Sequence, residues 1–244
     1  MLLSESPGTI AVPTAEIGRF TMFMVSMATT KQPSETNLSI MASASVVENL
    51  NQIIRQLRDD DAWIWILGDD HVWPQDTLMR LLDTMDQNDD IDVLVPLVVK
   101  RNPPWHLVLF HEAGVYDDGL PRWKPYGWDE VPETGTFEID AAGSAGMLVR
   151  REVLETMGDP WFQSSGGIVL NEDVMFCRKA REHGYNVYAT ADVTMGHLGI
   201  FNVRPLYREG RWGALTEFSS PEEQFQHIYM PVENEHPEVI GARG

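Results

Sequence analysis

Residues 63–82 read WIWILGDDHVWPQDTLMRLL and change character in the middle. The first part is a nearly continuous apolar run, which is typical of a strand buried on both faces of a parallel sheet. The last part begins at Pro74, which can occupy the first turn of a helix, and continues with leucines at helical spacing. Asp69, Asp70 and His71 lie between the two parts. We therefore predict a strand, a polar turn and a helix.

The alternation of strand and helix continues on both sides of this stretch. GTIAVPT, residues 8–14, predicts a first buried strand. SASVVENLNQIIRQL, residues 43–57, has helical spacing with Ser43 or Ser45 as N-cap, and IDVLVPLVV, residues 91–99, predicts the next strand. This order favours an α/β fold with a doubly wound, mainly parallel central sheet flanked by helices.

The second half of the chain contains one irregular segment and two ordered ones. Residues 100–136 are rich in proline and tryptophan, with a candidate strand at 106–110, and we expect this loop to border the site. Residues 136–158 predict a strand, a glycine-rich turn, a strand and a helix. Residues 171–199 predict a helix with Asn171 as N-cap, followed by a strand.

The length of 244 residues suits one sizeable α/β domain. We predict this domain over residues 1–218 and a C-terminal tail over residues 219–244, with a short helix and then loose chain. Cys177 is the single cysteine, which excludes an intrachain disulfide. Neither a signal-peptide pattern nor an apolar stretch of roughly 18 to 20 residues is found, so we expect a cytoplasmic protein without a membrane anchor.

The charge is strongly acidic, with 37 Asp and Glu against 18 Lys and Arg and a formal net charge of -19. Such a surface repels phosphate backbones, so binding of duplex nucleic acid through a broad basic face is disfavoured. An anionic small ligand would need local help from a cation or from helix N-termini.

Several polar side chains follow predicted strands, where open α/β sheets bind ligands. Along an extended segment Asp69 and His71 point the same way and Asp70 faces elsewhere, so Asp69 and His71 can hold a divalent metal such as manganese. A solvated helix cap explains the same residues equally well. His197 follows another predicted strand between glycines, although most single histidines are structural or exposed.

A second acidic pair, Glu172 and Asp173, begins a predicted helix. One of these carboxylates can orient or deprotonate a hydroxyl group. Favourable interaction with the helix dipole is the simpler explanation of the pair taken alone.

The order of four motifs resembles a nucleotide-sugar-dependent glycosyltransferase of the GT-A fold, close to the family-two-like group. The motifs are VPT near the start, GDDHVWPQDTLMRLL after the apolar strand, AAGSAGMLVRREVLETMG, and NEDVMFCRKAREHGYNVYATADVTMGHLG. The resemblance covers roughly residues 9–199 and implies the GT-A fold, a nucleotide-diphosphate sugar as donor and a hydroxyl acceptor.

The resemblance also implies a metal site. The family's Asp-x-Asp motif falls on Asp69, Asp70 and His71, with histidine in the last place, as in the Asp-x-His motif of some GT-A enzymes. A later histidine completes the site in those enzymes, and His197 matches it. We therefore assign Asp69, His71 and His197 to Mn2+ or Mg2+, and Asp69 or Asp70 to the ribose of the donor.

Further positions follow from the same resemblance. Pro13 and Thr14 match a loop that frames the nucleobase, with Glu16 beside it. A tight segment beneath the sugar matches Gly143, Ser144, Ala145 and Gly146. Glu172 and Asp173 match the Glu-Asp pair, in which the second residue is the general base of inverting members. Enzymes with the Asp-x-His motif include retaining ones, so the stereochemical outcome stays open, and either carboxylate can instead hold acceptor or sugar hydroxyls.

The remaining candidates have equally simple structural explanations. Basic residues near strand ends or in the final loop can touch phosphate or be ordinary surface charges: Lys100, Arg101 and Arg204. Tryptophans of the irregular segment can stack on a sugar or base or pack over the sheet edge: Trp105, Trp123 and Trp128.

We therefore expect a metal-dependent glycosyltransferase, a hexosyltransferase similar to compact phage enzymes. Its acceptor is a polysaccharide, a protein or a small molecule, and a hydroxymethylated DNA base is disfavoured by the charge. A nucleotidyltransferase is an alternative, but it would normally have a basic, glycine-rich loop after the first strand. The second alternative is a non-catalytic module that binds a nucleotide sugar. Sequence does not identify the donor sugar, its base or the oligomeric state.

Overall fold

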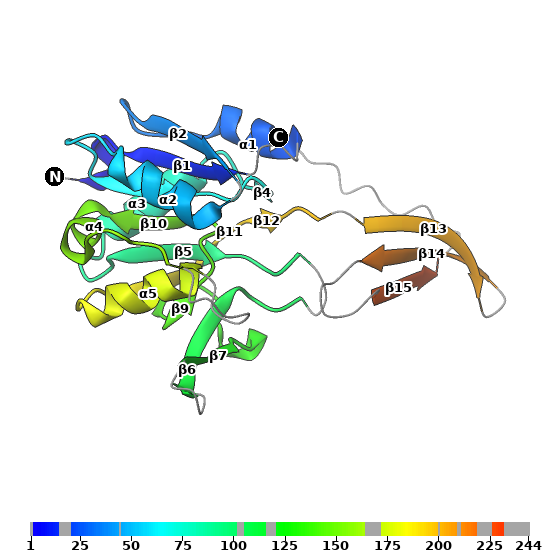
Figure 1. The fold of residues 1–244 in the computed structure, drawn as a ribbon. Coiled ribbons are helices and arrows are strands. Elements are labelled where there is room, and N and C mark those ends of the chain that lie inside the picture. The colour runs from blue at the N-terminus through cyan, green and yellow to red at the C-terminus, as the bar shows by residue number, and fades with distance from the viewer. Residues whose placement is uncertain are drawn as a thin grey trace. The chain divides into compact units, whose positions relative to one another are not determined.

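The computed structural model describes residues 2–14, 21–43, 45–101, 105–115, 121–163, 172–199, 201–208, 211–218 and 226–231 (Figure 1). The chain forms two compact units, which we describe separately. The larger unit contains residues 1–100 and 105–198, and the smaller contains residues 101–104 and 199–244. The units divide near residue 198, whereas we had expected one domain to continue to residue 218.

The larger unit has the predicted α/β architecture. Its helices are η1 Leu3–Glu5, α1 Thr21–Thr29, α2 Val46–Arg55, α3 Thr77–Asp86, η2 Trp128–Glu130, α4 Arg151–Met157 and α5 Glu172–Glu182. Its strands are β1 Thr9–Thr14, β2 Asn37–Ala42, β3 Trp63–Ile66, β4 His71–Val72, β5 Val93–Leu97, β6 Leu109–Val115, β7 Pro121–Pro125, β8 Thr136–Glu138, β9 Ala141–Ala142, β10 Met147–Arg150, β11 Val187–Thr194 and β12 Gly196–His197.

The central sheet has the strand order β2-β1-β3-β10-β5-β11-β8. β1 is parallel to β2 and β3, and β5 is parallel to β11. β10 is antiparallel to both β3 and β5, and β8 is antiparallel to β11. The sheet is therefore mainly parallel, as predicted, and the carboxyl ends of its five parallel strands meet at one edge.

The sheet buries apolar side chains on both faces. Along β3, Ile64 and Ile66 pack into one hydrophobic cluster with α2, α4 and α5, whereas Trp63 and Trp65 pack into a second cluster with α1 and α3. These four side chains are at most 1% exposed. Burying a side chain of this kind contributes about 1.5–3 kcal/mol. Burial on both sides explains the continuous apolar run with which this strand begins.

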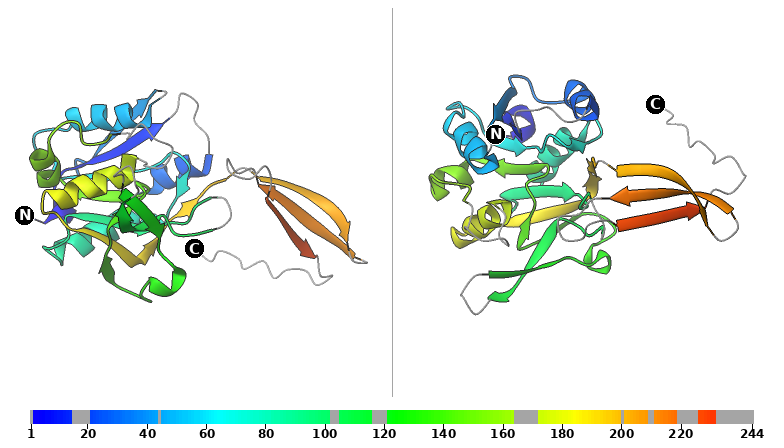
Figure 2. Two further views of the ribbon diagram at one scale, coloured as in Figure 1. Left: turned by 60° about the horizontal axis from the view of Figure 1, so that its bottom comes forward. Right: turned by 45° about the vertical axis from the view of Figure 1, so that its right-hand side comes forward.

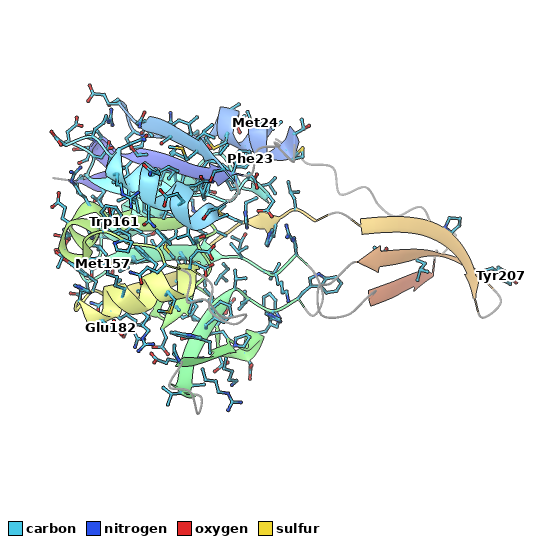
Figure 3. The ribbon with its side chains drawn as sticks, viewed as in Figure 1. Phe23, Met24, Met157, Trp161, Glu182 and Tyr207 are labelled. Carbon is cyan, nitrogen blue, oxygen red and sulfur yellow. The ribbon has the colours of Figure 1, made fainter. Side chains whose placement is uncertain are left out.

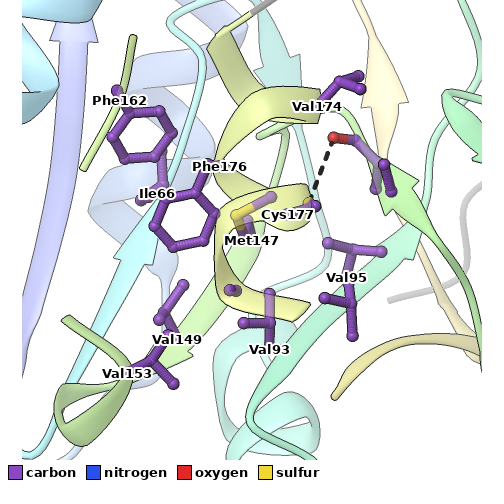
Figure 4. Close-up of a cluster of buried hydrophobic side chains, with 14 of the residues drawn as sticks. Ile66, Val93, Val95, Met147, Val149, Val153, Phe162, Val174, Phe176 and Cys177 are labelled. Carbon is purple, nitrogen blue, oxygen red and sulfur yellow. Dashed lines mark hydrogen bonds between the residues drawn. The ribbon is translucent and has the colours of Figure 1, made fainter. Parts of the chain in front are cut away.

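The cluster beneath α5 contains an aromatic stack and the cysteine (Figure 4). The ring centroids of Phe162 and Phe176 are 4.6 Å apart, with an interplanar angle of 11°. Cys177 is fully buried, with its Sγ 3.9 Å from the carbonyl oxygen of Ala142. Burial raises the pKa of this thiol to about 12, so the side chain serves as a small apolar group of the core.

The two helices nearest the opening stretch differ in how well their starts were predicted. Ser45 is the N-cap of α2, because its hydroxyl accepts a hydrogen bond from Glu48 N-H. α3 begins at Thr77, so Pro74 lies before the helix rather than in its first turn. Thr77 N-H donates to Pro74 O, and this turn delays the helix.

Several elements of the larger unit were missed or misjudged from the sequence. The segment expected to be irregular contains the antiparallel pair β6 and β7. β7 has a proline at each end, where a missing N-H group interrupts the ladder least. β6 also pairs with β9, and it overlaps the candidate strand at residues 106–110 only in its first two residues. The helix α1 and the edge strand β2 had not been predicted.

The smaller unit contains an antiparallel sheet of β13 Phe201–Arg208, β14 Arg211–Phe218 and β15 Gln226–Pro231 (Figure 2). β15 falls within the segment that was predicted to be a tail with a short helix, and its described residues are extended rather than helical. Its pairing with β14 gives it an extended backbone. In the described part of either unit, no helix is long and apolar enough to span a membrane.

Gly146 gives a test of packing beneath the sheet edge. Its φ is +74°, and a Cβ at this position would lie 2.5 Å from Met195 Sδ and 2.7 Å from Pro96 Cγ. Gly184 has a φ of +87° but no atom within 4 Å of the equivalent Cβ. We expect Gly184→Ala to lower the free energy of unfolding by about 1 kcal/mol from backbone strain alone. Gly146→Ala should lower it by about 3 kcal/mol, because overpacking adds to strain.

Urea denaturation followed by circular dichroism measures both values. Equal losses for the two variants would show that Met195 and Pro96 yield freely, against the close packing described here.

Candidate functional site

The carboxyl-end edge of the sheet carries most of the predicted site residues. Thr14 ends β1, and residues 69–71 follow β3. Lys100 lies beyond β5, and His197 lies just beyond β11. Parallel strands thus bring together segments that are far apart in sequence.

Three side chains form a compact group at this edge: Asp70, His71 and His197. Each offers one ligand atom, and these atoms all lie within 4.8 Å of one another. The antiparallel pair β4 and β12 sets His71 directly opposite His197, and their rings stack with centroids 4.2 Å apart. Leu198 N-H donates to Asp70 O at 2.7 Å, which joins the two segments beside the imidazoles.

The hydrogen bonds of His197 leave one ring nitrogen facing a carboxylate. Its Nδ1 lies 3.1 Å from the carbonyl oxygen of Val99, and a carbonyl only accepts, so Nδ1 carries the proton. In a neutral ring Nε2 then presents a lone pair, 3.3 Å from Asp70 Oδ2. Two acceptors at this distance need a proton or a cation between them. A backbone carbonyl behind a histidine is also the usual support of a metal ligand.

The ring nitrogens of His71 also lack hydrogen-bond partners among the described residues. Its side chain is 6% exposed, and in the described part of the chain neither buried ring nitrogen has a hydrogen-bond partner. Nδ1 lies 3.0 Å from Asp70 Oδ1, close enough for an ion pair but without hydrogen-bond geometry. Leaving such an atom unsatisfied is unfavourable by about 1–3 kcal/mol. The group therefore fits a divalent cation, and two imidazoles with one carboxylate suit Mn2+ better than Mg2+.

The carboxylate of this group is ionised. Burial of Asp70 opposes ionisation, but the contacts with His197 and His71 outweigh it and hold the pKa of the carboxyl well below its usual range. The side chain of Asp70 is 13% exposed. The group thus offers a negative charge in a largely desolvated position, which favours a bound cation.

Asp69 lies outside the group. The expectation that Asp70 faces away from His71 is wrong, because residues 69 and 70 form a turn and side chains alternate only along an extended strand. The assignment of Asp69 to the metal stays a prediction. The Thr14 hydroxyl donates to Asp69 Oδ2. Two residues assigned to the nucleoside, Thr14 and Asp69, are thereby brought together.

The loop of residues 143–146 connects this region with Asp173. Ser144 N-H donates to Asp173 Oδ2 at 3.2 Å, and a Cβ on Gly143 would lie 3.4 Å from the same oxygen. At the other end of the loop, Gly146 N-H donates to Ile66 O at the end of β3. A small residue at position 143 therefore allows the backbone to approach the carboxylate.

Asp173 is held at the start of α5 in an environment that disfavours its charge. Burial raises the pKa of its carboxyl to about 6, and the neighbouring Glu172 adds to the shift. Hydrogen bonds from Val174 N-H, at 2.8 Å, and from Ser144 N-H oppose it. A carboxyl with a pKa near neutrality is suited to accepting a proton from a hydroxyl group.

The other predicted residues are dispersed or lie outside the description. Pro13 is buried within β1, and Lys100 N-H donates to His106 O. Glu16 lies outside the described residues, as does the side chain of Arg204, whose backbone belongs to β13. Arg101 belongs to the smaller unit. Trp105 and Trp128 are exposed and Trp123 is half-buried: no ligand contact follows from these positions alone.

Two backbone groups of the site were missed by sequence analysis. They are the Val99 carbonyl, which orients His197, and the Ser144 N-H, which holds Asp173. Every residue except proline has both groups, so no sequence signal distinguishes them.

Residues 45–158 match the model of glycosyl transferase family 2. No curated protein matches the chain. The solved structure of A197 from STIV is 14% identical, with a TM-score of 0.51, and the alignment covers 94% of this chain and 100% of that one. GalNAc-T7, solved with UDP, GalNAc and Mn2+, is 12% identical, with a TM-score of 0.54. That alignment covers 83% of this chain and 44% of GalNAc-T7, so the present chain spans under half of that protein.

The raised pKa of Asp173 predicts a specific dependence of stability on pH. In the unfolded chain the pKa of the carboxyl is near its ordinary value of 3.8, whereas in the folded chain burial raises this pKa to about 6. The folded state binds more protons between these values, so stability falls as pH rises from about 4 to about 6. We expect the difference in unfolding free energy between Asp173→Asn and the wild type to change by about 3 kcal/mol over this window, in favour of the variant.

Urea denaturation at a series of pH values measures this difference. The control is Asp83→Asn, which removes an exposed carboxyl from α3 instead of the buried one. A difference for Asp173→Asn that stays constant with pH would show that the carboxyl is not raised.

Proposed function

Because residues 45–158 match glycosyl transferase family 2 and the fold is of the GT-A type, we propose that this chain is a metal-dependent glycosyltransferase. It transfers a hexose from a nucleotide-diphosphate sugar to a hydroxyl acceptor. The family match and the fold both support glycosyltransferase activity. GalNAc-T7 was solved with UDP and Mn2+, which accords with the donor class and the metal proposed here.

The observation that carries the proposal is the group of Asp70, His71 and His197 at the carboxyl-end edge. Its buried His71 ring lacks a hydrogen-bond partner among the described residues, and its His197 ring is oriented by a carbonyl. We propose that both imidazoles hold the ion together with a carboxylate of the Asp69-Asp70 pair. The described geometry favours Asp70, whereas the family motif favours Asp69.

A bound divalent ion would neutralise the donor diphosphate and stabilise the leaving nucleotide. The residues of the chain then bind and orient the donor. Thr14 and Asp69 offer a hydroxyl and a carboxylate to the ribose, and Lys100 is a candidate for a phosphate oxygen. The loop of residues 143–146 provides a surface of small residues on which the sugar can lie.

Asp173 is proposed as the general base. In an inverting reaction its carboxylate would accept the proton of the acceptor hydroxyl while the acceptor oxygen attacks the anomeric carbon. Hydrogen bonds from Ser144 N-H and Val174 N-H fix the carboxylate in place. In a retaining reaction, Glu172 or Asp173 would hold hydroxyl groups of the acceptor or the sugar.

The charge of the chain restricts the acceptor. With a formal net charge of -19, a neutral polysaccharide, a protein or a small molecule is favoured over DNA, because phosphate backbones are repelled. The donor diphosphate is then the anionic substrate, and the bound divalent ion would neutralise its charge.

Metal binding gives the first test. We expect Mn2+ to bind with a nucleotide diphosphate, and His71→Ala and His197→Ala to weaken metal binding by at least about 100-fold, since changes in mere supporting partners already give about 10- to 100-fold. Calorimetric titration measures the affinities, and a screen of nucleotide sugars measures Mn2+-dependent donor hydrolysis.

The matched control is His183→Ala, an exposed histidine on the turn after α5, which should bind Mn2+ like the wild type. Asp69→Asn and Asp70→Asn identify the carboxylate, because only the ligand should match the histidine variants. An absence of metal-dependent nucleotide binding would contradict the proposal. Binding without donor hydrolysis would favour a non-catalytic module.

The role of Asp173 gives a second test. Asp173→Asn should lower kcat for transfer by about 10²- to 10⁴-fold, because proton transfer is lost. In the wild type kcat/KM should rise with pH and level off above about 6, where the carboxyl is ionised. Steady-state kinetics over pH measures both. Transfer by Asp173→Asn with an unchanged rate would assign proton acceptance to another group.

A further inference from the structure

Most exposed large hydrophobic side chains of the described residues gather on α1, β2 and the start of α2. They are Met22, Met24, Val25, Leu38, Ile40 and Val46. Leu38 is 49% and Ile40 is 55% exposed, although both belong to a strand of the central sheet. α1 also packs against the segment after His71, since Ser26 Oγ accepts a hydrogen bond from Trp73 N-H, but the proposed function uses none of these apolar side chains.

β2 is the edge strand of the sheet, and its outer backbone groups are available for pairing. Asn37 N-H donates to Gly8 O and Ser43 N-H donates to Thr14 O. The backbone N-H and C=O groups of the odd-numbered residues in this segment therefore face β1. Alternation along the strand directs the N-H and C=O groups of Leu38 and Ile40 to the open side. Within the described ranges, no strand pairs with these groups.

The side chains of the same two residues extend an apolar face. Leu38 lies beside Ile10 and Ile40 beside Val12 in the parallel register, so each pair points to one face of the sheet. Ile10 and Val12 pack with Phe23 of α1. α1 therefore lies on the same face of the sheet, and Figure 3 labels Phe23 together with the exposed Met24 on this helix.

β2 lacks the features that keep edge strands apart. Natural edge strands are commonly protected by charged residues, proline or a bulge. Residues 36–47 contain no charged residue and no proline, and the register of β2 with β1 has no irregularity. In a chain with a net charge of -19, this uncharged segment lets a second copy approach without charges facing each other across the strands.

We propose that β2 pairs antiparallel with β2 of a second copy about a twofold axis. In the register centred on Ser39, Leu38 of each copy lies opposite Ile40 of the other, and all four residues direct N-H and C=O groups across the junction. The two sheets become continuous, and the apolar side chains of both copies share one face. A stable interface buries roughly 800 Å² per partner, so the proposed contact extends beyond the two paired strands.

Sedimentation velocity of the full chain over a dilution series tests this proposal. We expect a species of twice the chain mass of 27.6 kDa that dissociates on dilution. Ile40→Lys should give monomer at every concentration, because it places a charge opposite Leu38 of the other copy. Ile40→Pro should also give monomer, because it removes only an N-H group that faces solvent in a single copy.

Val115→Lys is the matched control, since Val115 is 67% exposed on β6, and this variant should remain dimeric. Circular dichroism verifies that each variant is folded, and Leu38→Lys replaces any variant that is not. A wild type that stays monomeric at all concentrations would overturn the proposal. Dimers that persist in the folded β2 variants would also overturn it. Neither result bears on the proposed glycosyltransferase activity.

Discussion

The reversal of β10 within an otherwise parallel arrangement is the constraint on which the candidate site depends. β10 pairs antiparallel with β3 through Met147 and Ile66, and with β5 on its other side. Because β10 runs backwards, it begins where its two neighbours end. The loop that precedes it is therefore held at the carboxyl-end edge by hydrogen bonds to Ile66 and from the Trp65 indole. If β10 ran parallel to β3 and β5, the loop before it would lie at the opposite edge of the sheet.

In the resulting site, backbone hydrogen bonds hold side chains in place, but the ring nitrogens of His71 have no hydrogen-bond partner among the described residues. Backbone groups fix the donor atoms: Val99 orients one imidazole, and Ser144 restrains the Asp173 carboxylate. The metal-site group itself contains more acceptors than donors among the described residues, as His71 illustrates. In the rest of the described chain, Trp123 Nε1 is the one other buried side-chain nitrogen or oxygen without a hydrogen-bond partner. This contrast is what marks the edge as a place for a cation and a polar substrate.

Sequence patterns predicted well what depends on neighbouring residues. The apolar run at Trp63–Ile66 and the N-cap Ser45 are local features, and both were found as expected. The resemblance to family-two-like GT-A enzymes was confirmed by the family match and the fold. Features that depend on distant partners were missed, such as β15, whose extended form requires β14. The orientation of Asp70 was also missed, because it depends on the dihedral angles of a turn.

The buried Cys177 has a practical consequence for studying the protein. Its thiol is fully enclosed beneath α5, and burial raises the pKa of the thiol to about 12, so almost none of it is thiolate at neutral pH. Alkylating reagents react with the thiolate and need access to sulfur. The native chain is thus already suited to labelling at a single introduced cysteine, without replacement of its own. A spin label or fluorophore placed on the surface would report on one chosen position in an otherwise unmodified protein.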